Sequence, residues 1–207
     1  MIFPDIEFEK KLWNRGYKLV CGIDEAGRGP LAGPVAAGAV VIDSTTELIP
    51  FVRDSKMMTL KQREDAFDLI KSSVLAWGVG LVEAKEIDRI GIQSAVSKAM
   101  LLAIKQVESM TKSQVEILIV DGKNVLDVSN YPIQKITKGD VYHYSISCAS
   151  VLAKVKRDRI MLEYSKLYPE YGFEYHVGYG TMKHIEAISK YGILEIHRKS
   201  FKPIKND

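Results

Sequence analysis

Residues 19–42 read LVCGIDEAGRGPLAGPVAAGAVVI and carry the strongest fold signal in the chain. Two apolar runs flank a segment rich in glycine and proline, which predicts two buried strands joined by a loop. Asp24 and Glu25 stand where the first strand ends and the loop begins. A phosphate bound by the glycines would meet two negative charges there, so either the loop binds no anion or a cation lies between them.

One alternative is a dinucleotide-binding loop, with Gly27, Gly29 and Gly33 as its glycines and Asp43 as the ribose-binding acid. Such a loop opens directly into a helix whose N-terminus meets the pyrophosphate. Pro34 and a second apolar strand follow instead, and the nine residues between Gly33 and Asp43 cannot hold both a helix and a strand. The sequence therefore disfavours a nucleotide-dependent oxidoreductase.

Helical and extended patterns alternate along the rest of the chain. Apolar residues at helical spacing predict helices at 59–74, 93–108, 145–167 and 182–191, the first with a capping box from Thr59 and Gln62. Alternating or continuous apolar runs predict strands at 77–83, 115–121 and 133–137. Three early strands with short connections, followed by strands alternating with helices, predict an α/β fold with a mixed sheet flanked by helices.

Length and composition are those of one soluble domain, with 207 residues of which 46% are hydrophobic and 27% charged. No apolar run approaches the roughly 20 residues of a membrane span. The N-terminus carries acids where a secretory signal would be basic and apolar. Cys21 and Cys148 lie in apolar segments and are interpreted as buried core residues. We expect a cytoplasmic protein that contacts no membrane.

Charge is unevenly distributed along the chain, although the formal net charge is only +3. Residues 1–134 hold 16 Lys and Arg against 18 Asp and Glu, a balance of −2. Residues 135–207 hold 13 against 8, a balance of +5. This basic last third is either a face that meets a polyanion or a solvated lysine-rich surface, and the charge pattern alone leaves both interpretations open.

Four acids follow predicted strands. Asp24, Glu25 and Asp121 fall at or just beyond the ends of buried strands, and Asp140 follows the short strand at 133–137. Ligands of open α/β sheets bind at such strand ends, and Mg²⁺ prefers carboxylate ligands together with phosphate oxygens. Each acid alone could form a turn. Four together indicate a site where a divalent cation converts a repulsive loop into a phosphate-binding one.

Seven segments of the sequence resemble the ribonuclease HII family, in order and over nearly the whole chain. They are GIDEAGRGPLAGPV at 22–35, DSK at 54–56, IVDG at 119–122, KGD at 138–140, SISCASVLAKVKRDR at 145–159, YPEYGFEYHVGYGT at 168–181 and HRKSF at 197–201. The related ribonuclease HIII family typically has a GTG-like loop where this chain has Gly27-Arg28-Gly29. The resemblance therefore favours the type II enzyme.

The resemblance implies one RNase H-like catalytic domain over residues 1–207, whose part from about 165 to 207 is a helical, substrate-binding extension. It implies an endoribonuclease that hydrolyses the phosphodiester 5′ to ribonucleotides embedded in duplex DNA, as in ribonucleotide excision repair, and the RNA strand of RNA–DNA hybrids. Such an enzyme would need Mg²⁺ or Mn²⁺, leave a 5′-phosphate and act as a monomer. The rival expectations are a ribonuclease HIII-like hybrid nuclease and a non-catalytic nucleic-acid-binding module of the same fold.

The resemblance also assigns a metal site. Asp24, Glu25, Asp121 and Asp140 become the catalytic, metal-binding carboxylates around two divalent ions roughly 3.5–4 Å apart. Because successive side chains of a strand point to opposite faces, we expect the strand to break or bulge at Asp24 and Glu25 so that both face one site.

The resemblance also implies contacts with the substrate. Gly27, Arg28 and Gly29 are expected to read the 2′-OH that separates RNA from DNA, partly through main-chain groups. Tyr179 would stack beside the RNA–DNA junction, and Lys56 would contact a phosphate.

Several polar residues have a structural interpretation. Lys154 and Arg157 either reach the nucleic-acid backbone or lie on a solvated helix face, and Asp158 is expected to be an ion-pair partner. His197 and Arg198 are expected to anchor the C-terminal segment, with a DNA contact as the alternative. The remaining histidines are interpreted as structural or surface side chains; they are His143, His176 and His184.

Three positions depart from the family's usual residues. Met57 and Val177 stand where lysine is common, and Gly91 stands where asparagine is common. Each change removes a possible polar or phosphate contact, and none touches the four acids. The departures therefore bear on affinity for DNA rather than on the reaction.

Overall fold

The protein is described by a computed structural model that covers residues 3–122, 128 and 130–204. Within that part of the chain, one sheet has the order β3-β2-β1-β4-β5. Its strands are β1 (Val20–Ala26), β2 (Val35–Val41), β3 (Ala76–Val82), β4 (Ile117–Asp121) and β5 (Ile133–Ile136). β1, β2 and β3 pair antiparallel, whereas β4 and β5 run parallel to β1. The predicted mixed sheet is confirmed.

The helices include all four that the sequence predicts. The helical elements of the described residues are α1 (Glu7–Trp13), η1 (Ser55–Met57), α2 (Leu60–Ser73), α3 (Ala84–Ile90), α4 (Ile92–Thr111), α5 (Gly139–Tyr142), α6 (Tyr144–Leu167), η2 (Pro169–Tyr171), α7 (Phe173–His176) and α8 (Met182–Tyr191). Thr59 caps α2 in the predicted capping box with Gln62. The elements that the sequence did not predict have seven residues or fewer, which is too short for a helical period to show.

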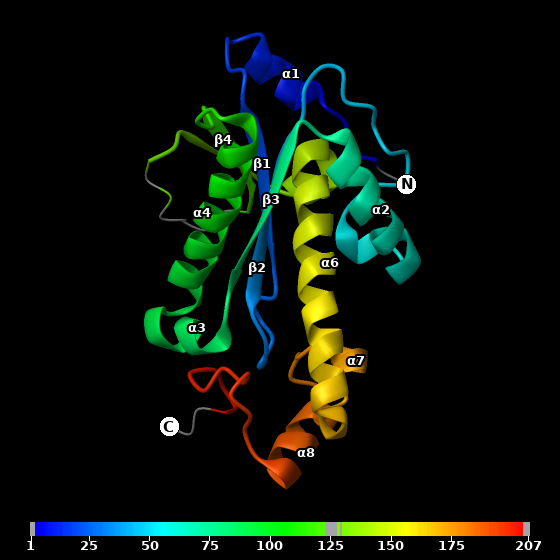
Figure 1. Ribbon diagram of the computed structural model, residues 1–207, viewed down its shortest axis with the longest axis vertical. Helices are drawn as coiled ribbons and strands as arrows, with labels where there is room; N and C mark the ends of the chain where they lie inside the picture. The colour runs from blue at the N-terminus through cyan, green and yellow to red at the C-terminus, as the bar shows by residue number, and fades with distance from the viewer. Residues whose placement is uncertain (1–2, 123–127, 129, 205–207) are drawn as a thin grey trace.

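The sheet is buried on both faces. In Figure 1 it stands nearly edge-on between α4 on one side and α6 with α2 on the other. Alternate residues of β2 enter separate cores, so Ala39 and Val41 pack with α4 while Val40 packs with α6. A Cβ on Gly38 would lie 2.1 Å from the carbonyl oxygen of Ala149, so glycine is what allows α6 to lie this close. Two-sided burial explains why this strand is continuously apolar in the sequence.

β1 continues without a break through the two adjacent acids. Its pairing with β2 keeps one register from Cys21 opposite Val41 to Ala26 opposite Ala36. The bulge predicted at Asp24 and Glu25 is therefore wrong. A regular strand sends neighbouring side chains to opposite faces, so the two carboxylates lie on different sides of β1.

The C-terminal third folds back onto the loop between β1 and β2. η2, α7 and α8 enclose a separate hydrophobic cluster with the end of α6, which includes Met161, Tyr171 and Phe173. Beyond α8, His197 forms an antiparallel bridge with Ala32 of the loop. The segment after α8 thus lies directly against the glycine-rich loop.

Two further sequence expectations can be compared with the structure. Cys21 and Cys148 are buried free thiols, as predicted. Among the residues that the structure describes, no helix has the length and apolar character needed to cross a membrane.

Candidate active site

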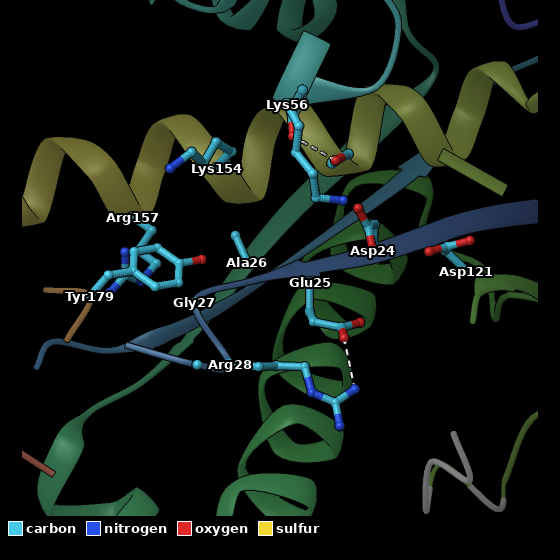
Figure 2. Close-up of a pocket in the computed structure, with 13 residues that line it drawn as sticks. Asp24, Glu25, Ala26, Gly27, Arg28, Lys56, Asp121, Lys154, Arg157 and Tyr179 are labelled. Carbon is cyan, nitrogen blue, oxygen red and sulfur yellow. Dashed lines mark hydrogen bonds and ion pairs between the residues drawn. The ribbon is translucent and has the colours of Figure 1, made fainter. Parts of the chain in front are cut away.

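Two of the candidate acids lie on neighbouring parallel strands, Asp121 as the last residue of β4 and Asp24 two residues before the end of β1. Ile23 of β1 pairs with Val120 of β4, so the next residues along, Asp24 and Asp121, lie side by side at the same end of the sheet. Figure 2 shows Asp24 and Glu25 pointing to opposite sides of β1, with Glu25 toward Arg28. The Arg28 guanidinium donates to Glu25 Oε1 at 3.0 Å.

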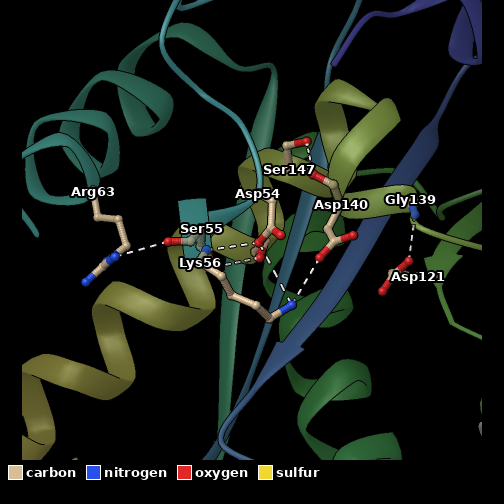
Figure 3. Close-up of polar contacts among 9 residues, drawn as sticks. Asp54, Ser55, Lys56, Arg63, Asp121, Gly139, Asp140 and Ser147 are labelled. Carbon is tan, nitrogen blue, oxygen red and sulfur yellow. Dashed lines mark hydrogen bonds and ion pairs between the residues drawn. The ribbon is translucent and has the colours of Figure 1, made fainter. Parts of the chain in front are cut away.

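Asp140 reaches the same region from the first turn of α5. The N–H of Gly139 donates to Asp121 Oδ1 at 2.6 Å and ties the start of α5 to the end of β4. The hydroxyl of Ser147 in α6 donates to the carbonyl oxygen of Asp140 at 2.7 Å. Asp140 is buried, and its carboxylate faces the ammonium of Lys56 (Figure 3).

Lys56 brings a positive charge to these acids from η1. Its Nζ lies 3.2 Å from Asp140 Oδ2 and 3.9 Å from Asp54 Oδ1. Burial lowers the pKa of the Lys56 ammonium, but attraction by Asp140 and Asp54 outweighs burial and raises this pKa above its usual value. Lys56 is therefore charged at neutral pH, and 74% of its side chain stays exposed.

The carboxylates of the site repel one another. Burial raises the pKa of Asp24 well above its usual value, and the charges of Glu25 and Asp121 raise it further. Burial also raises the pKa of Asp121, as does the charge of Asp140, although the Gly139 N–H opposes the rise. A site that gathers acids against their repulsion needs protons or cations to balance it.

A pocket of about 330 Å³ joins the acids to the glycine-rich loop. Eight of the nine predicted site residues line it: Asp24, Glu25, Gly27, Arg28, Gly29, Lys56, Asp121 and Tyr179. In Figure 2, Asp24, Lys56 and Asp121 lie toward one end of the pocket and Gly27 and Tyr179 toward the other. Asp140, the ninth, pairs with Lys56, which lines the pocket. A Cβ on Gly29 would lie 3.7 Å from Cε1 of Tyr179, so the loop and the tyrosine ring border one space.

Two buried arginines hold the glycine-rich loop from inside the protein. Arg198 donates to the carbonyl oxygens of Gly27, Arg28 and Gly33 at 2.6, 2.9 and 3.0 Å. The guanidinium of Arg157 donates in the same way to three further carbonyl oxygens, those of Ala32, Pro34 and Val177. The two side chains are 0% and 1% exposed, so the loop is fixed through its carbonyl groups.

These arginines settle two expectations from the sequence. The predicted anchoring role of His197 and Arg198 is confirmed. Both interpretations of Arg157 are wrong, because the side chain is buried and bonded to the main chain. The HRKSF and KRDR segments were visible in the sequence, but the carbonyl groups of a distant loop leave no sequence pattern that would identify them as the partners.

The donor set is suited to a divalent cation. Carboxylate oxygens are the ligands that Mg²⁺ and Mn²⁺ prefer. Burial and the charges of Glu25 and Asp121 raise the pKa of Asp24, and a nearby cation would favour its ionised form. Within the described residues, no three His, Cys, Asp or Glu side chains are grouped as a complete metal-ligand set. Three of the acids are engaged by protein donors instead, in the pairs Glu25–Arg28, Asp121–Gly139 and Asp140–Lys56. A bound cation would compete with these donors for the same oxygens.

The remaining polar candidates have structural partners. Lys154 pairs with Asp158 at 2.9 Å, as predicted for that acid, and also lines the pocket. His176 and His184 are buried in the C-terminal cluster, which confirms their structural interpretation. His143 is half-buried at the N-terminal end of α6, and its ring lies 4.9 Å from that of Phe8.

The three departures from the family pattern lie outside the acid cluster. Gly91 joins α3 to α4 with φ 80° and ψ 157°, a conformation open essentially to glycine alone. Met57 is exposed in η1, next to Lys56. Val177 takes the left-handed conformation with φ 42° at the end of α7, which is unusual for a β-branched residue.

Comparison with known protein sequences matches this chain to one family. The family model described as Ribonuclease HII matches residues 21–204. Ribonuclease HII of Caldicellulosiruptor bescii is 50% identical over 195 residues, which cover 94% of this chain and 92% of the relative. Ribonuclease HII of Acetivibrio thermocellus is 49% identical over 194 residues, with 94% and 73% covered.

The fold is also found among solved structures. The crystal structure of the ribonuclease H2 from Pyrococcus horikoshii OT3 matches with a TM-score of 0.73 at 27% sequence identity. The match covers 90% of this chain and 95% of that chain. The predicted RNase H-like α/β fold is thereby confirmed.

Proposed function

Because the chain belongs to the ribonuclease HII family and is a ribonuclease H, we propose that it hydrolyses the phosphodiester 5′ to a ribonucleotide embedded in duplex DNA, and the RNA strand of RNA–DNA hybrids. One observation carries this proposal. A single pocket is lined both by the acids Asp24, Glu25 and Asp121 and by the Gly27–Gly29 loop with Tyr179. An enzyme selective for an embedded ribonucleotide needs a hydrolytic centre and a reader of the 2′-OH side by side.

Asp24, Glu25, Asp121 and Asp140 are the residues that would hold Mg²⁺ or Mn²⁺. Divalent ions bound there would supply a water of lowered pKa and would stabilise negative charge on the leaving 3′ oxygen. The water oxygen bonds to phosphorus as the bond to the 3′ oxygen breaks, which leaves a 5′-phosphate and a 3′-hydroxyl. Lys56 would contact the phosphate as a further cation beside the acids.

The glycine-rich loop and Tyr179 are the proposed readers of the ribose. Gly29 has no Cβ that would keep a sugar from the main chain, and Arg198 fixes the loop through the carbonyl groups of Gly27 and Arg28. The Tyr179 side chain is 45% exposed at the same pocket, and an exposed aromatic ring can stack on a base or a sugar.

Residues from about 165 to 207 are proposed to bind the duplex around the cut. They include α8 and the segment that braces the glycine-rich loop. All nine predicted site residues gather within one copy of the chain, which supports our proposal that the enzyme acts as a monomer.

The experiment that tests the proposed function is cleavage of a labelled DNA duplex that carries one ribonucleotide, with and without Mg²⁺. We expect one Mg²⁺-dependent cut 5′ to the ribonucleotide. Cleavage of long RNA–DNA hybrids without cleavage of the single ribonucleotide would favour a ribonuclease HIII-like preference. Binding without any cleavage would favour a non-catalytic module.

Gly29→Ala is expected to lower kcat/KM for the single ribonucleotide about tenfold without loss of fold. The added Cβ would lie in ordinary contact with Tyr179, at 3.7 Å, so the loop can keep its shape. The methyl group would instead occupy space that the sugar needs for close approach. Steady-state kinetics, with thermal unfolding to confirm an unchanged fold, would measure this effect.

Gly27→Ala provides the contrast for that variant. Gly27 has φ +88°, and a Cβ there would lie 2.1 Å from Nε of the buried Arg157, so this substitution should lower stability as well as activity. Wild-type kinetics for Gly29→Ala would show that the loop does not approach the sugar closely.

Affinity for the duplex is expected to fall steeply with salt, because residues 135–207 carry a balance of +5. If about four phosphates are neutralised, an increase from 50 to 200 mM salt lowers affinity on the order of 10²-fold. Lys183→Gln, at an exposed position of α8, should reduce the logarithmic salt slope by about 1. Lys61→Gln on α2 is the matched control and should leave the slope unchanged. Fluorescence anisotropy measures both; a flat salt response would contradict the basic-face interpretation.

A further inference from the structure

A chain of hydrogen bonds through two histidines ends on the backbone of Tyr179. His184 Nδ1, in α8, lies 2.9 Å from the carbonyl oxygen of Tyr179. His184 Nε2 lies 3.1 Å from Nε2 of His197. The Nδ1 of His197 accepts from the N–H of Leu194 at 2.9 Å. Both imidazoles are buried, with 0% and 1% of their surface exposed.

The partners at the two ends fix the protonation state of this chain. A carbonyl oxygen only accepts, so His184 Nδ1 carries a hydrogen, and a backbone N–H only donates, so His197 Nδ1 carries none. In the hydrogen bond between the two rings, Nε2 of His197 therefore donates and Nε2 of His184 accepts. Both rings are neutral, and one extra proton on either ring would set two N–H groups against each other.

The surroundings favour the same neutral state. Burial lowers the pKa of His197 to about 4, and the neighbouring His184 contributes to the decrease. Burial also lowers the pKa of His184, with His176 stacked on its ring at a centroid distance of 4.5 Å. Tyr171 of η2 also packs against the pair, with its ring centroid 5.4 Å from that of His197.

The hydrogen bonds through the two histidines connect Tyr179 to the glycine-rich loop. The N–H of Tyr179 donates to the carbonyl oxygen of His176 at 2.8 Å, and its carbonyl oxygen accepts from Thr181 N–H at 2.8 Å. Both of those partners are close in sequence. The histidine pair adds the link to a distant segment, because His197 also bridges Ala32 in the loop that follows Gly29.

We propose that His184 and His197 are positioning residues that set Tyr179 against the ribonucleotide through this neutral hydrogen-bond chain. The inference rests on the role proposed for Tyr179 above. The histidines are buried and act on the substrate only through Tyr179, whose carbonyl group His184 holds.

Two substitutions at one position separate this role from simple packing. His184→Leu removes both hydrogen bonds of the ring, whereas His184→Asn keeps an N–H donor near the place of Nδ1. We expect kcat/KM on a duplex with one ribonucleotide to fall about tenfold for His184→Leu, within the range of about 5- to 150-fold that loss of stacking by Tyr179→Ala implies. His184→Asn should recover most of that loss. Equal losses for both variants would overturn the inference.

A double substitution tests whether the histidine acts through the tyrosine. In a Tyr179→Ala background, His184→Leu should cause no further decrease beyond about twofold, because residues that act through one another are not additive. A second full tenfold loss would overturn the inference. If His184→Leu fails to fold, His197→Asn serves the same cycle, since it keeps an acceptor for Leu194 N–H and removes only the link between the rings.

A matched control comes from the same cluster. The Tyr171 hydroxyl donates to the carbonyl oxygen of Gly192 at 2.8 Å, so Tyr171→Phe deletes one hydrogen bond of the cluster without touching the link to Tyr179. It should lower stability and keep wild-type kinetics; a loss of activity as large as that of His184→Leu would overturn the inference. Wild-type kinetics for Tyr179→Ala would remove the proposed role of Tyr179, and this inference with it. If Tyr179→Ala lowers kcat/KM and His184→Leu does not, the inference about the histidines is overturned and the proposed role of Tyr179 stands.

Discussion

Asp121→Asn is expected to lower kcat/KM for a duplex with one ribonucleotide on the order of 10³-fold, the scale of losing one strong electrostatic contribution at a reacting centre. Asparagine keeps the size of the side chain, and its oxygen can still accept the N–H of Gly139. What it lacks is the negative charge at the end of β4 that lies beside Asp24. The variant should therefore fold normally and fail to hold the cations that hydrolysis needs.

Steady-state cleavage at saturating Mg²⁺ measures this effect, with circular dichroism as a check of fold. Asp68→Asn is the matched control, because Asp68 is an exposed acid of α2 that pairs only loosely with Lys71, at 3.6 Å. The control should cleave as the wild type does. Turnover of Asp121→Asn within tenfold of the wild type would remove Asp121 from the catalytic centre.

Asp24→Asn should abolish cleavage to a similar extent and, in metal-free protein at pH 8, raise the free energy of unfolding by about 0.5–2 kcal/mol. The pKa of Asp24 is raised in the folded state, so the native protein binds its proton more tightly than the unfolded chain does. Stability from this group is therefore present at low pH and is lost as pH rises through the folded pKa. Asparagine is neutral throughout and avoids that loss.

Mg²⁺ should reverse this difference in stability, so that the wild type becomes more stable than Asp24→Asn. Binding of Mg²⁺ to the folded state alone should stabilise the wild type, whereas the variant lacks the carboxylate proposed as a ligand and should gain little. Thermal unfolding with and without Mg²⁺, between pH 6 and pH 8, measures both trends. A metal-free variant less stable than the wild type at pH 8 would show that the charge of Asp24 is not the unfavourable group.

Much of the fold follows from local pattern. The continuous apolar runs on either side of the glycine-rich loop became β1 and β2, and the Thr59–Gln62 pair marked the start of α2. These signals are local, so a single sequence contains them. α1 and α3 have seven residues each, and elements that short gain their stability from packing that no local pattern records.

The site was predictable in its membership more than in its geometry. Acids at strand ends and a resemblance to one family brought together residues that line one pocket. The bulge expected between Asp24 and Glu25 rested on the premise that both carboxylates share a face, but β1 stays regular and Glu25 turns to Arg28. The metal-binding role of Glu25, like that of the other three acids, is a proposal.

Long-range hydrogen bonds were beyond the sequence. Arg157 lies in a helix with many basic residues, which suggested a solvent or nucleic-acid contact. Its partners are carbonyl groups of Ala32 and Pro34, more than a hundred residues away, at 3.1 and 2.9 Å. Every residue carries a carbonyl group, so such partners cannot be identified from residue types.

The claim that one pocket both reads a ribose hydroxyl and cuts beside it is tested most directly with two duplexes. They are identical except that one carries a single 2′-OH, and each is incubated with the wild-type protein and Mg²⁺ under the same conditions. The duplex with the hydroxyl should be cut once, 5′ to the ribonucleotide, and the all-DNA duplex should remain intact. Equal cleavage of the two duplexes would contradict the role given to the Gly27–Gly29 loop and the selectivity proposed for the enzyme.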